Sequence, residues 1–140
     1  RLVRGVDLRM MNEKSEKDRY GRTLAVLTLP DGRILNRVLV QSGHAFFYPH
    51  GRTLDELDRV LLDDQRTAMA SHRGFWGRIL LRPEASQSFV GSEQSRRFHT
   101  SDCPYGKRIN WKNRISFSTL REAFGAGYAP CRSCTPWPGE

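Results

Sequence analysis

The chain has 140 residues, of which 38% are hydrophobic and 27% charged, a composition typical of one globular domain or two small ones. No apolar run approaches the ~20 residues needed to span a membrane, so we expect no membrane partner. The formal net charge of +8 and the sequence pI near 10.0 favour a polyanionic partner, and they make nucleic acid, DNA or RNA, the leading candidate.

Two strands are predicted at the start of the chain. Residues 6–11 alternate apolar and polar side chains, and residues 22–29 are rich in β-branched and aliphatic ones. The polar and charged residues 12–21 are expected to form the loop between them. The dipeptide Asp31-Gly32 is a strong turn signal, so the chain should reverse direction there.

Two helices are predicted next. The apolar spacing in ILNRVLVQSG predicts a short helix that Gly43 ends as a left-handed cap. A longer helix should begin at Thr53, with Glu56 completing a capping box, and Gly74 should end it. Its predicted buried stripe consists of Leu54, Leu57, Leu61 and Ala68.

A linker is predicted at residues 81–87, where Pro83 and small polar residues break the periodicity. It would separate a first unit at residues 1–80 from a second unit at 88–140. The second unit shows one strand in FVGS, another in NRISFS, and a short helix with Thr119 and Glu122 as its capping box. These elements are too few to bury a normal core in ~50 residues, so the second unit needs an additional cross-link to stabilise its fold.

A structural zinc site is the predicted cross-link. His99 and Cys103 lie four positions apart, and Cys131 and Cys134 form a Cys-x2-Cys pair after 27 intervening residues. Structural zinc takes four thiolate and imidazole ligands at such spacings, and this set uses all three cysteines. The alternatives are a redox-active Cys-x2-Cys pair and a disulfide with one free thiol. A redox pair normally opens a helix, which the following TPWPGE does not favour.

The segment that begins with FVGS and ends with CRSC resembles the small zinc-binding module of the Ada DNA-repair family. The resemblance covers about residues 88–140 and rests on the ligand spacing. That family holds its metal with four cysteines, the first of which accepts methyl groups from DNA phosphotriesters. Here the first position is His99, and imidazole is a poor methyl acceptor compared with thiolate. The resemblance therefore implies a zinc-stabilised α/β module and argues against a zinc-dependent methyl acceptor.

The stretch with the signature DRYGR at residues 18–22 is similar to the thermonuclease (staphylococcal nuclease) family, and the match runs over about residues 2–77. The resemblance implies an OB-fold barrel of five strands with flanking helices. The family's N-terminal strands have no counterpart in this sequence, so the barrel should be partial. The whole chain is thus expected to be α+β, a partial OB-fold unit followed by the zinc module.

Hydrolysis of phosphodiester bonds in nucleic acid is the activity that this resemblance implies. In the family, a calcium-bound water attacks phosphorus, and two arginines stabilise the charge that develops. Arg22 matches the second arginine and is the expected catalytic residue, while Arg19 and Tyr20 match positions that bind the substrate. The structural alternative is that Arg22 only forms an ion pair with Asp18.

The family's first arginine, its calcium carboxylates and its glutamate have no counterpart in the sequence. We therefore expect the chain to be catalytically incomplete by itself, and its open strand edges to associate with an upstream segment or another chain. The alternative function is a non-catalytic nucleic-acid-binding protein in which both units contact phosphate. Relatives of this nuclease are often exported, so the resemblance favours a periplasmic or secreted location.

Overall fold

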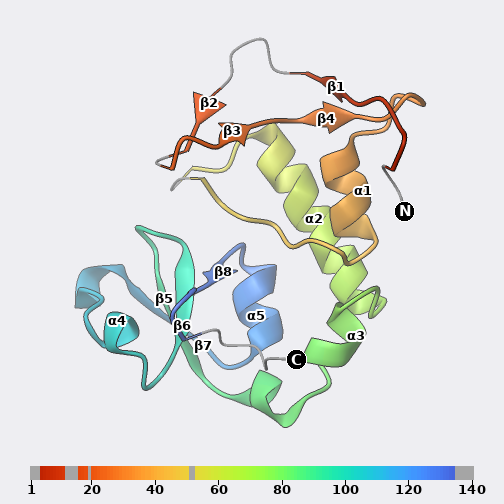
Figure 1. The fold of residues 1–140 in the computed structure, drawn as a ribbon. Coiled ribbons are helices and arrows are strands. Elements are labelled where there is room, and N and C mark those ends of the chain that lie inside the picture. Colours follow the sequence, from red (N-terminus) through yellow and green to blue (C-terminus); the bar gives the residue numbers. More distant parts are fainter. Residues whose placement is uncertain (1–3, 12–15, 19, 51–52, 135–140) are drawn as a thin grey trace. The chain divides into compact units, whose positions relative to one another are not determined.

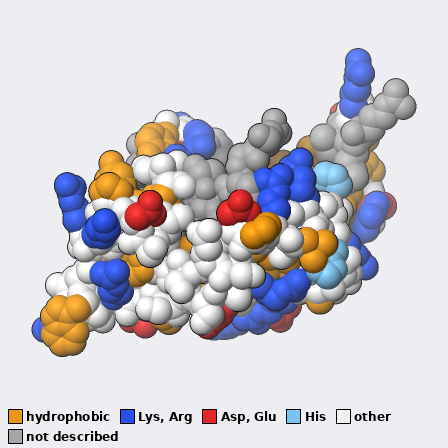
Figure 2. All heavy atoms as spheres, turned by 90° about the horizontal axis from the view of Figure 1, so that it is seen from below, with side chains coloured by type: hydrophobic (Ala, Val, Ile, Leu, Met, Phe, Trp, Pro, Cys, Tyr) orange, Lys and Arg blue, Asp and Glu red, His pale blue; other side chains and the backbone are white. Residues whose placement is uncertain are grey.

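The computed structural model describes residues 4–11, 16–18, 20–50 and 53–134 (Figure 1). The chain divides into two compact units, Arg1–Leu39 and Val40–Glu140. Small sheets are combined with five helices in the described residues, which confirms the predicted α+β class. On the face drawn in Figure 2, Lys and Arg side chains are widespread and Asp and Glu side chains few, in keeping with the net charge of +8. No helix in the described ranges is long and apolar enough to cross a membrane.

The first unit contains four short strands, β1 (Arg9–Met10), β2 (Glu16–Lys17), β3 (Thr23–Leu24) and β4 (Leu27–Thr28). Strand β1 pairs antiparallel with β4, and β2 pairs antiparallel with β3, which gives two separate two-stranded sheets. The single strand predicted at 22–29 is therefore divided. Its division is due to a residue outside the strand, because the side chain of Asn36 donates to the Ala25 carbonyl at 3.2 Å and accepts from the Leu27 amide at 3.0 Å.

The loop predicted between the first two strands contains β2, so part of it is extended and paired. The sequence of the loop is polar and does not alternate, which hid this strand from the pattern analysis. That the two small sheets belong to an OB-fold barrel stays a prediction.

The predicted turn and helix follow. Gly32 has a φ of 83°, and its amide donates to the Leu29 carbonyl at 2.9 Å. Helix α1 (Leu35–Gln41) ends shortly before Gly43, which has the predicted left-handed conformation with a φ of 69°. A Cβ at Gly43 would also lie 2.2 Å from the Arg73 carbonyl oxygen, so both the conformation and the space require glycine there.

The long helix α2 (Glu56–Ala70) has its N-cap two residues later than predicted. Its N-cap is Asp55, whose side chain accepts from the Asp58 amide at 2.8 Å, while Asp58 accepts from the Asp55 amide at 3.3 Å. The predicted capping box of Thr53 and Glu56 is therefore wrong. Two aspartates three residues apart form the same reciprocal box, and they hold the helix start.

The buried stripe of α2 is also displaced. Leu62, Gln65, Ala68 and Met69 are buried, whereas Leu54, Leu57 and Leu61 are only half-buried. The prediction is thus confirmed for Ala68 alone, and the buried face is displaced by about one residue along α2. One member of the stripe, Gln65, is polar and fully buried.

The second unit also contains a four-stranded sheet with the order β7-β5-β6-β8. Its strands are β5 (Phe89–Ser92), β6 (Arg97–Thr100), β7 (Arg114–Phe117) and β8 (Ala129–Pro130). Strand β5 pairs antiparallel with β6 and β7, and β8 joins β6 in parallel. Between the strands lie the short helices α4 (Pro104–Lys107), η2 (Trp111–Asn113) and α5 (Leu120–Gly125).

One aromatic core joins the helices and the sheet of the second unit. The ring of Phe124 on α5 lies 4.9 Å from that of Trp76 on α3 (Trp76–Ile79) and 5.1 Å from that of Phe98 on β6. Met69 and Ala68 of α2 belong to the same buried cluster. The C-terminal sheet therefore shares its core with α2 and α3.

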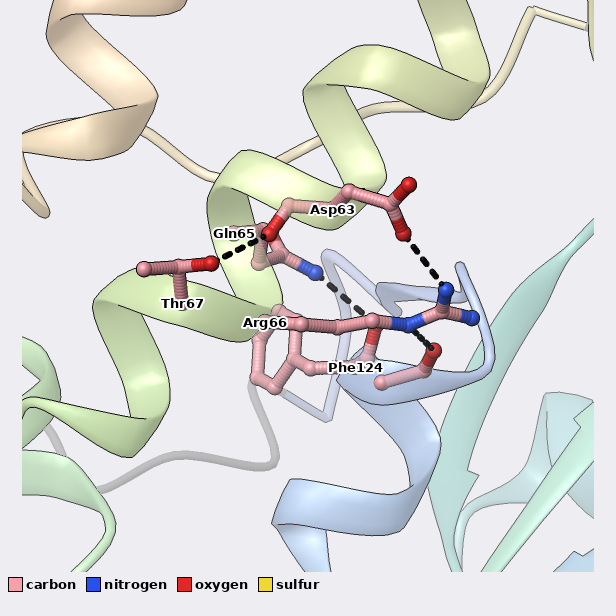
Figure 3. A network of polar contacts seen from close by, with 6 residues as sticks. Asp63, Gln65, Arg66, Thr67 and Phe124 are labelled. Atoms are coloured by element: carbon pink, nitrogen blue, oxygen red, sulfur yellow. Dashed lines mark hydrogen bonds and ion pairs between the residues drawn. The ribbon is translucent and has the colours of Figure 1, made fainter.

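Polar contacts reinforce this junction (Figure 3). Gln65 on α2 donates to the Phe124 carbonyl at 2.8 Å and accepts from the Phe47 amide at 2.7 Å. The neighbouring Arg66 donates to the Gly125 carbonyl at 2.9 Å and pairs with Asp63 at 2.8 Å. Both side chains project from α2 toward the end of α5, so α2 and α5 are held together by hydrogen bonds as well as by packing.

The segment predicted to be a linker contains the short helix η1 (Pro83–Ser86). Its Ala85 is 5% exposed and lies in the aromatic core. Residues 40–80 and 88–140, which lie on either side of this segment, are therefore packed together within the second compact unit. That residues 1–80 and 88–140 form separate domains stays a prediction.

Candidate functional site

A tight turn between β2 and β3 presents the first candidate site. The carboxylate of Asp18 accepts hydrogen bonds from the backbone amides of Tyr20 and Arg22 at 2.9 and 3.0 Å. Two backbone hydrogen bonds of 2.9 Å close the turn, from the Gly21 amide to the Asp18 carbonyl and from the Asp18 amide to the Arg22 carbonyl. Gly21 has a φ of 78°, which suits glycine at this point.

The Arg22 guanidinium is held by the same carboxylate. Its Nε and Nη2 atoms each lie 2.6 Å from Asp18 Oδ2, and its Cζ lies 5.4 Å from the ring centroid of Tyr20. The Arg22 side chain is nonetheless 65% exposed, against 16% for Asp18. The ion pair thus orients the guanidinium and leaves donors that can reach a phosphate.

The charge of Asp18 is stabilised in this turn. Partial burial raises the pKa of Asp18, but the hydrogen bonds from Arg22 and from the Tyr20 amide outweigh it and hold the pKa below its usual value. Asp18 is therefore ionised at neutral pH and available to orient Arg22. Tyr20 is 58% exposed beside the guanidinium, and Arg19 lies outside the described residues.

The second candidate site is a cluster of four side chains in the second unit. His99 lies on β6, and Cys103 is the N-cap of α4. Cys131 follows β8, and Cys134 lies in the turn after it. Parallel pairing of β8 with β6 brings the second pair of residues beside the first, although more than 25 residues separate them in sequence.

The ligand-type atoms of the cluster lie within 4.8 Å of one another. Cys103 Sγ is 3.4 Å from His99 Nδ1, and the Ser133 amide donates to Cys131 Sγ at 3.3 Å. His99, Cys103 and Cys131 are between 3% and 8% exposed, so the cluster is shielded from solvent. Three sulfurs and one imidazole nitrogen form a soft donor set that could hold a metal ion.

The alternatives for the cysteines fit this geometry less well. All three are free thiols, and no disulfide joins them. Cys131 follows a strand and Cys134 lies in a turn, so neither opens a helix within the described residues. A thioredoxin-type pair would place its first cysteine at a helix N-terminus, which lowers the thiol pKa.

The titration of the cluster is consistent with metal ligation. Burial lowers the pKa of His99, which keeps its imidazole in the neutral form that coordinates metals. Burial raises the pKa of Cys131, but hydrogen bonds from the Cys134 and Ser133 amides outweigh it and the pKa is lowered. Burial raises the pKa of Cys134 to about 11, and the neighbouring cysteines add to the effect. A bound cation would remove these protons, because coordinating thiols are deprotonated.

Two arginines near the cluster are engaged with aromatic rings. The guanidinium carbon of Arg96 lies 5.6 Å from the ring centroid of Tyr128, and that of Arg97 lies 4.0 Å from the ring centroid of Tyr48. Both arginines therefore pack against aromatic rings, and they also contribute positive charge near the cluster. Lys107 and Arg108 on and after α4 are exposed.

Three residues were not predicted from the sequence, namely the buried Gln65 and the exposed aromatic residues Tyr105 and Trp111. Gln65 carries no sequence signal, because a single polar residue in an amphipathic helix is normally on the solvent side. A signal for the other two exists in the run YGKRINWKNR, which interleaves aromatic and basic residues without an acidic one.

Comparison with known proteins bears on the first site. Residues 3–78 match the staphylococcal nuclease homologue family. Two proteins named as uncharacterized endonucleases, one of Escherichia coli O157:H7 and one of Escherichia coli, are each 38% identical over 61 residues. Those residues are 44% of this chain and 37% of each relative, so the chain spans little more than a third of the length of the curated relatives it matches.

Proposed function

The chain belongs to the staphylococcal nuclease homologue family, and from that membership we propose that it serves the hydrolysis of phosphodiester bonds in nucleic acid. The observation that carries the proposal is the turn at Asp18, which holds an exposed, oriented Arg22 within the matched residues. A nuclease needs such a group, because negative charge grows on the phosphoryl oxygens as the bond breaks.

Arg22 is assigned to transition-state stabilisation, and Tyr20 and Arg19 are assigned to substrate binding. A planar guanidinium can donate to two phosphoryl oxygens at once, and Asp18 keeps one edge of it fixed. The exposed Tyr20 ring offers a surface against which a base or sugar can pack. These assignments come from the family resemblance, and the turn geometry supports those of Arg22 and Tyr20.

Calcium, which the family implies, has no matching ligand set among the described residues. The one group of three or more His, Cys, Asp or Glu side chains found there is the His–Cys cluster, whose thiolates do not suit a hard cation. Arg22 neither binds a cation nor activates water. We therefore propose that the chain is catalytically incomplete by itself and that the carboxylates come from elsewhere, for example from a segment that pairs with the two small sheets. Export to the periplasm or medium is proposed on the family resemblance alone.

For the C-terminal part, we propose a structural zinc ion held by His99, Cys103, Cys131 and Cys134 in an Ada-like module. The buried donors within 4.8 Å of one another support this proposal. Zinc would supply a cross-link between β6, α4 and the chain end, since a structural site has no open position for chemistry. With imidazole in the first position, methyl transfer from phosphotriesters is not proposed.

A non-catalytic nucleic-acid-binding protein is the second candidate. The net charge of +8 favours it, because neutralising phosphates releases counterions and needs no catalytic groups. For the chain as it stands, we expect weak binding without sequence preference that falls steeply with salt, and little or no cleavage.

The test measures cleavage of labelled nucleic acid, with calcium and with chelator, by this chain and by the full natural protein. Calcium-dependent cleavage by the natural protein should fall roughly 100-fold or more in Arg22→Ala. The matched control is Arg33→Ala, because Arg33 pairs with Asp31 in a similar exposed turn at 2.7 Å. Equal activity of the two variants would refute the role of Arg22, and no cleavage by the natural protein would favour the binding protein.

A further inference from the structure

Two large aromatic side chains are exposed to solvent on the segment that links β6 to β7. Trp111 is 78% exposed and Tyr105 is 57% exposed, although exposing apolar surface to water is unfavourable by about 25 cal/mol per Å². We propose that residues 105–114, here called the aromatic–basic turn, bind single-stranded nucleic acid by stacking its bases on Trp111 and Tyr105. The inference rests on the proposed function, since it gives the same polymer a second contact surface.

Basic side chains surround the two rings. The aromatic–basic turn contains Lys107, Arg108, Lys112 and Arg114, all exposed, and no acidic residue occurs from 103 to 121. Within the described part of the chain, none of these four takes part in the ion pairs that are seen. The Lys112 ammonium lies 5.6 Å from the ring centroid of Trp111, where it can contact a phosphate beside a stacked base.

The backbone of the turn is held in place. The Lys107 amide donates to the Cys103 carbonyl at 2.9 Å, and the Asn110 side chain accepts from the Lys112 amide at 3.0 Å. The Glu93 amide donates to the Asn113 carbonyl at 2.8 Å, which ties the turn to the β5–β6 hairpin. A fixed backbone lowers the entropy lost when a flexible strand binds.

Close packing fixes the first half of the turn against the sheet. Gly106 is buried, and a Cβ there would lie 3.0 Å from the Cβ of His99 and 3.1 Å from a methyl carbon of Val90. Tyr105 therefore projects into solvent from a backbone that rests on β5 and β6. The rings are presented by an anchored element and not by a loose loop.

Unpaired bases are the partner that fits these features. Stacking requires an exposed base face, which an intact duplex offers only at its ends, whereas a single strand offers one at every nucleotide. The cations suit the accompanying phosphates and give binding that weakens with salt. Exposed aromatic rings alone would fit an apolar protein surface, but the run of cations without acids favours a polyanion.

The test measures the affinity of the intact chain for a fluorescent single-stranded oligothymidylate and for a duplex, by anisotropy in calcium-free buffer. Trp111→Ala should weaken single-strand binding roughly 5- to 150-fold, and Trp111→Phe should restore most of it. Leu81→Ala is the matched control, because Leu81 is an apolar residue with 72% exposure outside the turn. Lys112→Ala should lower the slope of log affinity against log salt by about 0.7, and Arg78→Ala outside the turn tests whether that change is local.

The outcomes separate this inference from the proposed function. Equal affinities of Trp111→Ala, Leu81→Ala and the parent chain for the single strand would overturn the inference. So would a Trp111→Ala loss confined to the duplex. Binding that depends on Trp111, in a natural protein that does not cleave with calcium, would uphold the inference and reject the nuclease. Each variant is first checked for an unchanged circular dichroism spectrum, which a solvent-facing substitution should leave intact.

Discussion

Gln65 and Phe124, which are 59 residues apart in the sequence, are joined by a hydrogen bond of 2.8 Å between the Gln65 Nε2 and the Phe124 carbonyl. The same side chain accepts from the buried amide of Phe47 at 2.7 Å. One glutamine thus connects three segments of the second unit. Because a buried amide without an acceptor is costly, Gln65 should be worth more to stability than an ordinary polar residue.

Gln65→Leu should lower the free energy of unfolding by about 1–3 kcal/mol, because it leaves the Phe47 amide without an acceptor. The Phe124 carbonyl keeps a partner, since the Gly127 amide donates to it at 3.0 Å. Urea unfolding followed by circular dichroism measures the change. Thr67→Ala is the control on the exposed side of α2 and should cost under about 0.5 kcal/mol. Similar losses in both variants would contradict the role given to Gln65.

Asp55→Ala should destabilise the second unit by about 1 kcal/mol, because it removes the cap of α2. Thr53→Ala should be nearly neutral, although the sequence pattern placed the cap there. Thermal unfolding of the two variants side by side decides between the positions. A larger loss in Thr53→Ala would restore the capping box predicted from the sequence.

Local patterns account for what the sequence predicted correctly. The helix α5 begins after Thr119, because the Thr119 hydroxyl accepts from the Glu122 amide at 3.1 Å. A threonine three residues before a glutamate is a short pattern that can be recognised from the sequence alone. The grouping of His99 with Cys103, and of Cys131 with Cys134, follows likewise from short spacings. Even here the detail differs, since the Glu122 carboxylate accepts from Ser118 at 2.7 Å.

Contacts between distant segments account for what the sequence did not reveal. Strand β8 has only two residues, one of them Pro130, and exists because it pairs with β6. The burial of Gln65 likewise depends on Phe47 and Phe124, which no window around Gln65 contains. The division of the strand at 22–29 depends on the side chain of Asn36. Such features are set by tertiary structure, which periodicity does not report.

If the proposed zinc site exists, His99→Ala should reduce bound zinc from about one ion per chain to near zero, because it removes one of the four proposed ligands. The helical signal of α2 should weaken as well, since the sheet that carries His99 shares its core with Met69 and Trp76. Elemental analysis and circular dichroism of protein purified without added zinc provide the measurements. His44→Ala changes an exposed histidine and should alter neither. Metal-free parent protein with fully reactive thiols would refute the site.

The turn at Asp18 should respond to acid. The pKa of Asp18 is lower in the folded chain than the 3.8 of an unperturbed aspartate, so its stabilising contribution is complete above pH ~3.8 and is lost as the pH falls through the lowered value. Carboxyl titration by NMR should show this pKa rising toward 3.8 in Arg22→Ala. Arg33→Ala should leave it unchanged and raise the pKa of Asp31, which Arg33 lowers by its side-chain hydrogen bond. An unchanged pKa of Asp18 in Arg22→Ala would mean that the ion pair does not form in solution.

The shared core around Phe124 restricts how this chain can be shortened or recombined. The nuclease homology ends at residue 78, between Trp76 and Ile79, both of which are buried against the C-terminal elements. A gene fusion or deletion made at that boundary would cut through packed aromatic rings and expose them to solvent. A cassette that begins at Val40, the start of the second compact unit, and continues through Cys134 would keep those rings covered when it is moved to another protein.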